Sequence, residues 1–279
     1  MSVYFSLDQF HETADAIRER TQHRPTIGMI LGSGLGSVAE EVQAADRLSY
    51  LNLPHWPEST VEGHAGRLIL GELDGHSVVV MQGRAHYYEG YTMAQVGLPV
   101  RVMQLLGVQI LVITNAAGGV NPRFTPGDLM LITDHVNLIG MGGLNPLRGA
   151  NIDPIGPRFP DMMDSYDPEL RSLAVHAAAE AGLGLQQGVY VSLAGPNFET
   201  PADLRFLQAI GADAVGMSTV PEVIVARHGG TRVLGLSGIS NKANLDGNTP
   251  TTHEEVLQAG RVIVPKLVTI IRGVLRGVR

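Results

Sequence analysis

A glycine-rich turn, Gly32–Ser37, follows the first strongly apolar run of the sequence. Its glycines would let the backbone fold closely around an anion, with N–H groups and the Ser33 hydroxyl as hydrogen-bond donors. The same turn could simply be a tight connection into the helical segment predicted at 38–43. Its glycine spacing matches neither a nucleoside-triphosphate loop nor the dinucleotide-binding fingerprint. On its own, the turn is an unspecific candidate for a phosphate site.

An arginine and a histidine follow another apolar run, at Arg84 and His86. In extended backbone these two side chains point to the same side, where a guanidinium and an imidazole could bind one phosphate together. The alternative is a surface arginine paired with Glu89 and a histidine bonded to backbone. His64 lies in a glycine-flanked loop upstream and, taken alone, is predicted to be solvated.

Three later apolar runs end in residues suited to a planar ligand or an anion. The small residues of Asn115–Gly119 predict a loop that permits close approach of a ligand, or only a tight turn. Phe198 could stack on a heterocycle while Glu199 accepts hydrogen bonds from its N–H groups. Equally, Glu199 could favour the positive end of the following helix. Ser218 is either a helix N-cap, the more common role, or an anion contact.

The last apolar run ends in Ser240–Asn244, which contains Lys242, one of only two lysines in the chain. His253 stands at the start of the final predicted helix, where it could be only a boundary residue. The histidines show no metal-ligand spacing, and neither a nucleophile elbow nor a zinc-protease helix motif occurs. A metal site is therefore not expected.

These residues could meet only if several strands end at one edge of a sheet. Most of the apolar runs are nearly continuous, which is typical of strands buried on both faces. The predicted strands are Thr26–Leu31, Val78–Met81, Ile110–Thr114, Leu129–Thr133, Val189–Leu193, Ala214–Met217 and Val233–Ile239. The predicted helices are an N-terminal amphipathic one and those at Met93–Leu106, Pro168–Ala181, Pro201–Ile210, Pro221–His228 and Glu254–Leu275.

This alternation predicts an α/β fold, a single domain over residues 1–279 with a central mostly parallel or mixed β-sheet flanked by helices. Ligands of such sheets bind beyond the carboxyl ends of the strands, where the residues above lie. The irregular stretch Gly140–Met163 is too long for a passive connection, so it is predicted to be a functional loop or an interface.

Composition excludes several classes of protein. The chain has 279 residues, 44% of them apolar and 17% charged, which is incompatible with disorder. It has no cysteine, which excludes disulfides and thiolate chemistry and fits a reducing compartment. No segment has the length and apolarity of a membrane span or a signal peptide, so a cytoplasmic protein is expected. The formal charge of −7 and the absence of basic runs disfavour nucleic-acid binding.

Eight segments, in this order, resemble the trimeric purine nucleoside phosphorylases, a family that also includes methylthioadenosine phosphorylase. They are GSGLG (32–36), EGHAGR (62–67), GRAHYYEGY (83–91), TNAAGG (114–119), PGDLMLITDHVN (126–137), GPNFET (195–200), MSTVPEVIVARH (217–228) and HEEVLQAG (253–260). Eight collinear segments are far more specific than one glycine-rich turn. The resemblance implies reversible phosphorolysis of a purine nucleoside to free base and pentose 1-phosphate, with orthophosphate as co-substrate, no cofactor, and a homotrimeric assembly.

The resemblance also implies roles for individual residues. Phosphate would be held by Ser33, His64, Arg84, His86, the Ala116 backbone and Ser218. The nucleoside would be bound by Tyr88, Phe198, Glu199, Met217, Asn241, His253 and, from a neighbouring subunit, Phe159. Asn241, Glu199 and His86 would be the catalytic residues. The segment between Lys242 and His253 matches no part of the family pattern, and its composition suits a lid.

Asn241 bears on specificity. A neutral amide can donate to purine N7 and to a 6-oxo oxygen, whereas an aspartate would accept from a 6-amino group. Asn241 therefore favours inosine, guanosine and their 2′-deoxy forms.

The main rival interpretation is methylthioadenosine phosphorylase, which Asn241 and His253 disfavour. A nicotinamide-dependent oxidoreductase is disfavoured by the glycine spacing, and a non-catalytic nucleoside binder would leave the phosphate-binding residues without a purpose.

Overall fold

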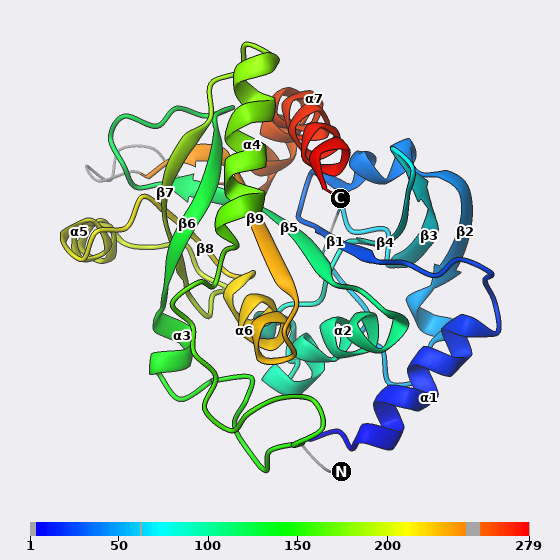
Figure 1. Ribbon diagram of the computed structural model, residues 1–279. Helices are drawn as coiled ribbons and strands as arrows, with labels where there is room; N and C mark the ends of the chain where they lie inside the picture. Colours follow the sequence, from blue (N-terminus) through cyan, green and yellow to red (C-terminus); the bar gives the residue numbers. More distant parts are fainter. Residues whose placement is uncertain (1–3, 62, 244–251, 279) are drawn as a thin grey trace.

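The computed structural model describes residues 4–61, 63–243 and 252–278, except the side chain of residue 253. Within these ranges nine strands form one sheet (Figure 1). The strands are β1 (Ile27–Leu31), β2 (Gln43–Ser49), β3 (Arg67–Leu73), β4 (His76–Gln82), β5 (Ile110–Gly119), β6 (Leu129–Asn137), β7 (Gln186–Ser192), β8 (Ala214–Gly216) and β9 (Arg232–Lys242). The helices are α1 (Leu7–Arg18), α2 (Met93–Leu106), α3 (Leu138–Met141), α4 (Pro168–Glu180), α5 (Pro201–Ala209), α6 (Val220–His228) and α7 (His253–Gly277).

The strand order is β2-β3-β4-β1-β5-β8-β7-β6-β9, and β9 also pairs with β5. The strands β5, β8, β7, β6 and β9 therefore form a closed circuit of pairings, to which β1 to β4 add an open wing. Parallel pairs join β1 to β4 and β5, β5 to β9, and β7 to β6 and β8, while the remaining pairs are antiparallel. The expected mixed central sheet is confirmed, and the closed circuit is an addition to it.

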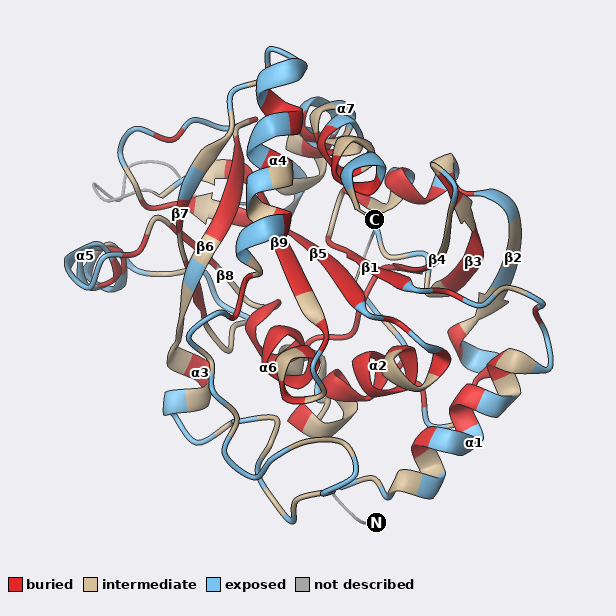
Figure 2. Cartoon of the chain, viewed as in Figure 1, coloured by how far each residue is buried: buried red, intermediate tan, exposed pale blue. Residues whose placement is uncertain are grey.

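Helices cover both faces of the sheet (Figure 1). On one face α1, α2 and α6 pack together, and on the other α4 packs against α7. The strands supply apolar side chains to both layers: in β1, Met29 and Leu31 belong to the cluster under α4 and α7, whereas Ile30 belongs to the cluster under α2 and α6. Figure 2 shows the resulting continuous buried centre. Continuous apolar runs form these strands because no face of them meets water.

Local signals set the helix ends. Ser6, Thr92 and Thr200 cap their helices in capping boxes, and Pro168 and Pro201 open α4 and α5 at the first position, as their fixed φ favours. The six predicted helices are all present, whereas the segment predicted as helical at 38–43 forms instead a 3₁₀ helix over Gly36–Glu41.

Four expectations are corrected. Strands β2 and β3 were not predicted. Asn115–Gly119 is neither a loop nor a turn but the end of β5, and β9 continues past its predicted end at Ile239 to Lys242, because these two segments pair as parallel strands. Small residues permit this close pairing, since a Cβ added to Gly119 of β5 would lie only 3.0 Å from Ile239 Cγ2 of β9. Ser218 is not the N-cap of α6, since that position is Thr219.

Candidate active site

A pocket lies where the expected strand ends converge. Residues at or just after the ends of β1, β4, β5, β8 and β9 line it, together with the segment between β7 and α5 and the start of α7. Ten of the residues singled out in the sequence line this one pocket: Ser33, Arg84, His86, Tyr88, Ala116, Phe198, Glu199, Met217, Ser218 and Asn241. The fold thus collects groups suited to an anion and groups suited to a planar base into a single cavity.

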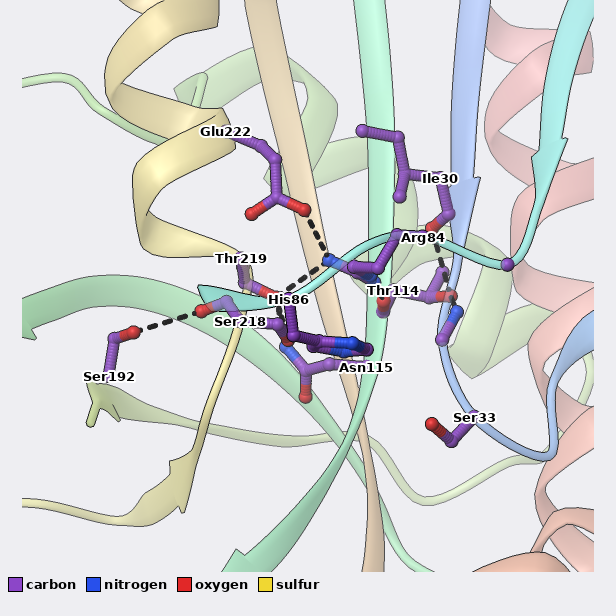
Figure 3. A network of polar contacts seen from close by, with 12 residues as sticks. Ile30, Ser33, Arg84, His86, Thr114, Asn115, Ser192, Ser218, Thr219 and Glu222 are labelled. Atoms are coloured by element: carbon purple, nitrogen blue, oxygen red, sulfur yellow. Dashed lines mark hydrogen bonds and ion pairs between the residues drawn. The ribbon is translucent and has the colours of Figure 1, made fainter. Parts of the chain in front are cut away.

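Arg84 lies almost fully buried at one end of the pocket. Its Nη1 donates to Glu222 Oε1 at 3.0 Å and to Thr219 Oγ1 at 3.4 Å, and its Nη2 donates to the Thr114 carbonyl (Figure 3). Within the described part of the chain, Arg84 Nε has no hydrogen-bond partner. A buried, unpaired N–H is costly, and a bound anion would satisfy it. Because Arg84 is buried and its ion pair is with Glu222, the alternative of a surface arginine paired with Glu89 is wrong.

Thr219 holds the turn beside Arg84 in an unusual conformation. Its φ of 74° lies in the left-handed region, which a β-branched residue rarely occupies. The surrounding contacts impose it: Val220 N donates to Ser218 O at 2.8 Å, and Thr219 Oγ1 accepts from Asn115 Nδ2 at 2.9 Å as well as from Arg84. Strain of this kind persists only where several contacts enforce it, and it is concentrated at functional sites. Here it places Ser218 on the pocket wall.

Two histidines and a tyrosine stack along the same end. The His64 and His86 rings lie 5.4 Å apart, and His86 and Tyr88 lie 4.7 Å apart. His64 Nε2 is 3.0 Å from Ser33 Oγ, so this histidine is tied to the glycine-rich turn instead of being solvated. Burial is the main cause that lowers the pKa of His64 to about 4, and the nearby His86 contributes to this shift. At neutral pH His64 is therefore an uncharged hydrogen-bonding group.

His86 is paired with Glu89, at 2.8 Å between Nδ1 and Oε1. Burial alone would raise the pKa of Glu89, but hydrogen bonds from His86 and Thr60 outweigh it and lower that pKa to about 2. A permanent carboxylate at Nδ1 holds the imidazole in one orientation. The other ring edge of His86 is thus the part suited to a ligand.

Phe198 and Glu199 form the opposite end, on the segment between β7 and α5. Phe198 is 45% exposed. Glu199 is half-buried, and this burial raises the pKa of the Glu199 carboxyl. Gly195 lets Met217 approach this segment, because any Cβ on Gly195 would collide with the Met217 sulfur. An exposed aromatic ring beside a carboxylate and a thioether suits a flat heterocycle with N–H groups.

Asn241 lies near the end of β9 and lines the pocket. Its amide oxygen accepts from Ser240 Oγ at 2.8 Å, which fixes the orientation of the amide group. The described residues contain no cluster of three or more histidine, cysteine or acidic side chains able to hold a metal ion.

Comparison with known proteins agrees with this geometry. The family model described as "Phosphorylase superfamily" matches residues 26–276. Purine nucleoside phosphorylase 1 of Geobacillus stearothermophilus is 51% identical over 265 residues, which cover 95% of this chain and 96% of that protein. Purine nucleoside phosphorylase of Rattus norvegicus is 51% identical over 271 residues, with coverages of 96% and 94%. The chain belongs to the purine nucleoside phosphorylase family.

Solved structures of the family have the same fold. The Schistosoma mansoni purine nucleoside phosphorylase in complex with adenosine has a TM-score of 0.95 at 42% identity, covering 100% of this chain and 99% of that one. The same protein in complex with inosine has a TM-score of 0.94 at 41% identity, with equal coverage. The expected α/β phosphorylase fold and the classification of the chain as an enzyme are therefore established.

Two predicted site residues of this phosphorylase, His64 and Phe159, do not line the pocket, and neither does Lys242, to which the sequence assigned no role. His64 contacts three residues that line the pocket, namely Ser33, Arg84 and His86, without lining it itself. Phe159 is 87% exposed and does not line the pocket of its own subunit. Lys242 donates to the Pro122 carbonyl at 3.1 Å instead of lining the cavity. The side chain of His253 and the segment 244–251, expected as a lid, lie outside the described residues.

Sequence reasoning missed the support behind the pocket. Glu222 resembled an ordinary acid in the first turn of a helix, and Thr219 had no signal of a strained backbone. Asn115 was recognised only as part of a small-residue segment.

No helix in the described ranges is long and apolar enough to cross a membrane.

Proposed function

We propose that this phosphorylase cleaves 6-oxopurine ribonucleosides and 2′-deoxyribonucleosides reversibly, using orthophosphate, to give free base and pentose 1-phosphate. One observation carries the proposal. The buried Arg84, with its unpaired Nε–H, and the base-binding candidates Phe198, Glu199 and Asn241 line the same pocket. Phosphate and nucleoside would therefore meet within a single cavity.

At the phosphate end, Arg84 Nε, His86 and the hydroxyls of Ser33 and Ser218 are the proposed donors, with the backbone of Ala116. His64 would act through its 3.0 Å contact with Ser33. These donors are held by other contacts before any ligand arrives, so little ordering is needed on binding. The dianion would be bound by one guanidinium together with imidazole, hydroxyl and backbone donors, which is compatible with a net charge of −7.

The proposed reaction needs no enzyme nucleophile. A phosphate oxygen forms the new bond to C1′ as the C1′–N9 bond breaks, with inversion at C1′. The sugar becomes oxocarbenium-like, and the phosphate stabilises its positive charge. The departing purine carries negative charge, and Asn241 would donate to N7 as that charge develops. Such a contact stabilises the transition state more than the ground state.

Recognition of the base would rest on Glu199 and Asn241. Glu199 would accept from the N1–H of a 6-oxopurine, and Phe198 would stack on the ring. Because Ser240 engages the amide oxygen of Asn241, the NH₂ group is the part that we expect to meet N7 and O6. This donor favours a 6-oxo over a 6-amino group. Tyr88 and Met217 would pack on the ribose, with His253 at its 5′-hydroxyl.

The assembly is part of the proposal. Phe159 lies in the long segment after α3 and is 87% exposed, although aromatic side chains of its size are usually buried. We infer that the chain forms a homotrimer in which Phe159 completes the neighbouring site. We further propose that residues 1–279 act as one domain, in the cytoplasm, with no cofactor besides the phosphate co-substrate.

The deciding test is release of hypoxanthine from inosine with and without added phosphate. Release that requires phosphate and yields ribose 1-phosphate is expected. Release without phosphate would indicate a hydrolase, and no release would indicate a binder. A panel of inosine, guanosine, adenosine and methylthioadenosine measures specificity, since a preference for methylthioadenosine would favour the rival phosphorylase.

A further inference from the structure

A buried ion pair lies behind the phosphate end of the pocket. Arg84 Nη1 and Glu222 Oε1 are 3.0 Å apart, and the two side chains are only 2% and 3% exposed. Arg84 lines the pocket, whereas Glu222 comes from the first turn of α6 and lies above the guanidinium in Figure 3, with Ser33 and Asn115 below it. Glu222 does not line the pocket, so the carboxylate contacts the arginine from outside the cavity.

The donors of Arg84 are divided between the protein and the cavity. A guanidinium has five N–H groups and keeps its positive charge when buried. The protein engages Nη1 through Glu222 and Thr219, and Nη2 through the Thr114 carbonyl. In the described part of the chain Nε has no partner. The carboxylate thus fixes one end of the guanidinium, and the Nε–H group of this pocket-lining arginine is left for a ligand to engage.

We propose that Glu222 is a resident counterion of Arg84, a positioning residue that holds the guanidinium and moderates its affinity for phosphate. This inference rests on the proposed function, in which Arg84 binds phosphate. A buried guanidinium without an anion is strongly unfavourable, so the empty site needs a negative charge nearby. The same charge repels the incoming dianion, and it weakens the binding of phosphate and of pentose 1-phosphate. Glu222 thereby favours product release.

The matched variant is Glu222→Gln, because it keeps an acceptor for Arg84 and removes only the charge. Glu222 Oε2 has no hydrogen-bond partner among the described residues, so an NH₂ group in its place displaces no donor. Loss of one buried charge close to a dianion should lower the KM for phosphate by about 3- to 10-fold. The KM for inosine should stay within about twofold, and kcat should fall if product release becomes slower.

The control is Glu169→Gln, which also removes a carboxylate paired with an arginine. Glu169 Oε2 lies 2.6 Å from Arg232 Nη2, but it is 72% exposed on α4 and does not line the pocket. This variant should leave the KM for phosphate unchanged. A second readout is thermal unfolding, in which saturating phosphate should raise the Tm of Glu222→Gln more than that of the wild type.

The possible outcomes test the counterion role of Glu222 separately from the proposed function. A lower KM for phosphate together with a larger phosphate-induced rise in Tm supports the counterion role. An unchanged or higher KM, with phosphate-dependent cleavage intact, overturns that role and leaves the proposed function standing. A variant that stays unfolded at saturating phosphate also overturns it, because bound phosphate should replace the missing charge. Loss of phosphate dependence in the wild type would instead refute the proposed function.

Discussion

Ser33 Oγ lies 3.0 Å from His64 Nε2, although the two residues belong to separate loops. The other ring nitrogen of His64 is 2.8 Å from Ser59 Oγ. With the pKa of His64 lowered to about 4, the contact is between neutral groups near pH 7. The histidine therefore orients the Ser33 hydroxyl at the entrance to the phosphate end without adding charge to it.

The lowered pKa of His64 predicts a loss of stability in acid. The unfolded histidine has a pKa of 6.5 and the folded one about 4, so the unfolded state binds more protons between these values. The free energy of unfolding should therefore fall as the pH decreases from 6.5 towards 4. In His64→Gln this fall should be smaller. The measurement is Tm against pH at one fixed protein concentration, since oligomers unfold in a concentration-dependent way.

His176→Gln is the control for this experiment. His176 is 72% exposed, so its replacement should leave the dependence of Tm on pH unchanged. Parallel curves for wild type and His64→Gln would show that protonation of His64 does not contribute to acid unfolding.

The glycine-rich turn also depends on a close contact with α7. A Cβ added to Gly260 would lie 2.5 Å from the Gly34 carbonyl oxygen, and Gly34 has a φ of 74°. Gly260→Ala should displace the turn, destabilise the protein by about 1–3 kcal/mol and raise the KM for phosphate. Gly184→Ala is the matched control, because no atom lies within 4 Å of its added Cβ. Equal stability and KM in the two variants would contradict the contact.

Much of the fold could be predicted because the strands buried on both faces are nearly continuous apolar runs. Strand β2 escaped prediction because Gln43–Ser49 has exposed and half-buried positions and contains no apolar run. Strand β3 has only Leu68–Leu70 as consecutive apolar residues. The boundaries of β5 and β9 were misjudged at Asn115–Gly119 and Ser240–Lys242, where small or polar residues usually end a strand but here allow two strands to pair closely.

The candidate site could be predicted where residues follow strands, as Arg84 and Ser33 do. Its support could not, because that depends on pairings between distant parts of the chain. Glu222 meets Arg84 across 138 positions, and Thr219 joins Asn115 across 104. The left-handed backbone of Thr219 has no sequence signal either, since glycine or asparagine usually occupies such positions.

Asn241→Asp should shift the base preference towards adenosine. An aspartate can accept from a 6-amino group, but it repels the electron-rich N7 and O6 of hypoxanthine. The ratio of kcat/KM for inosine to that for adenosine should fall at least about tenfold, which corresponds to roughly 1.4 kcal/mol in transition-state binding. Asn52→Asp, at an exposed position, makes the same chemical change as a control. Unchanged ratios in Asn241→Asp would refute the assigned role.

Phe159 predicts complementation between subunits. Phe159→Ala should raise the KM for inosine while the fold is retained, because the side chain is exposed in its own subunit. Arg84→Met should be inactive but still supply an intact Phe159. When the two variants are co-expressed, mixed trimers contain Phe159→Ala subunits whose sites receive Phe159 from an Arg84→Met neighbour. These trimers should therefore recover a low KM for inosine, which neither variant shows alone. A KM equal to that of Phe159→Ala in purified mixed trimers, or a monomeric wild type by light scattering, would exclude a shared site.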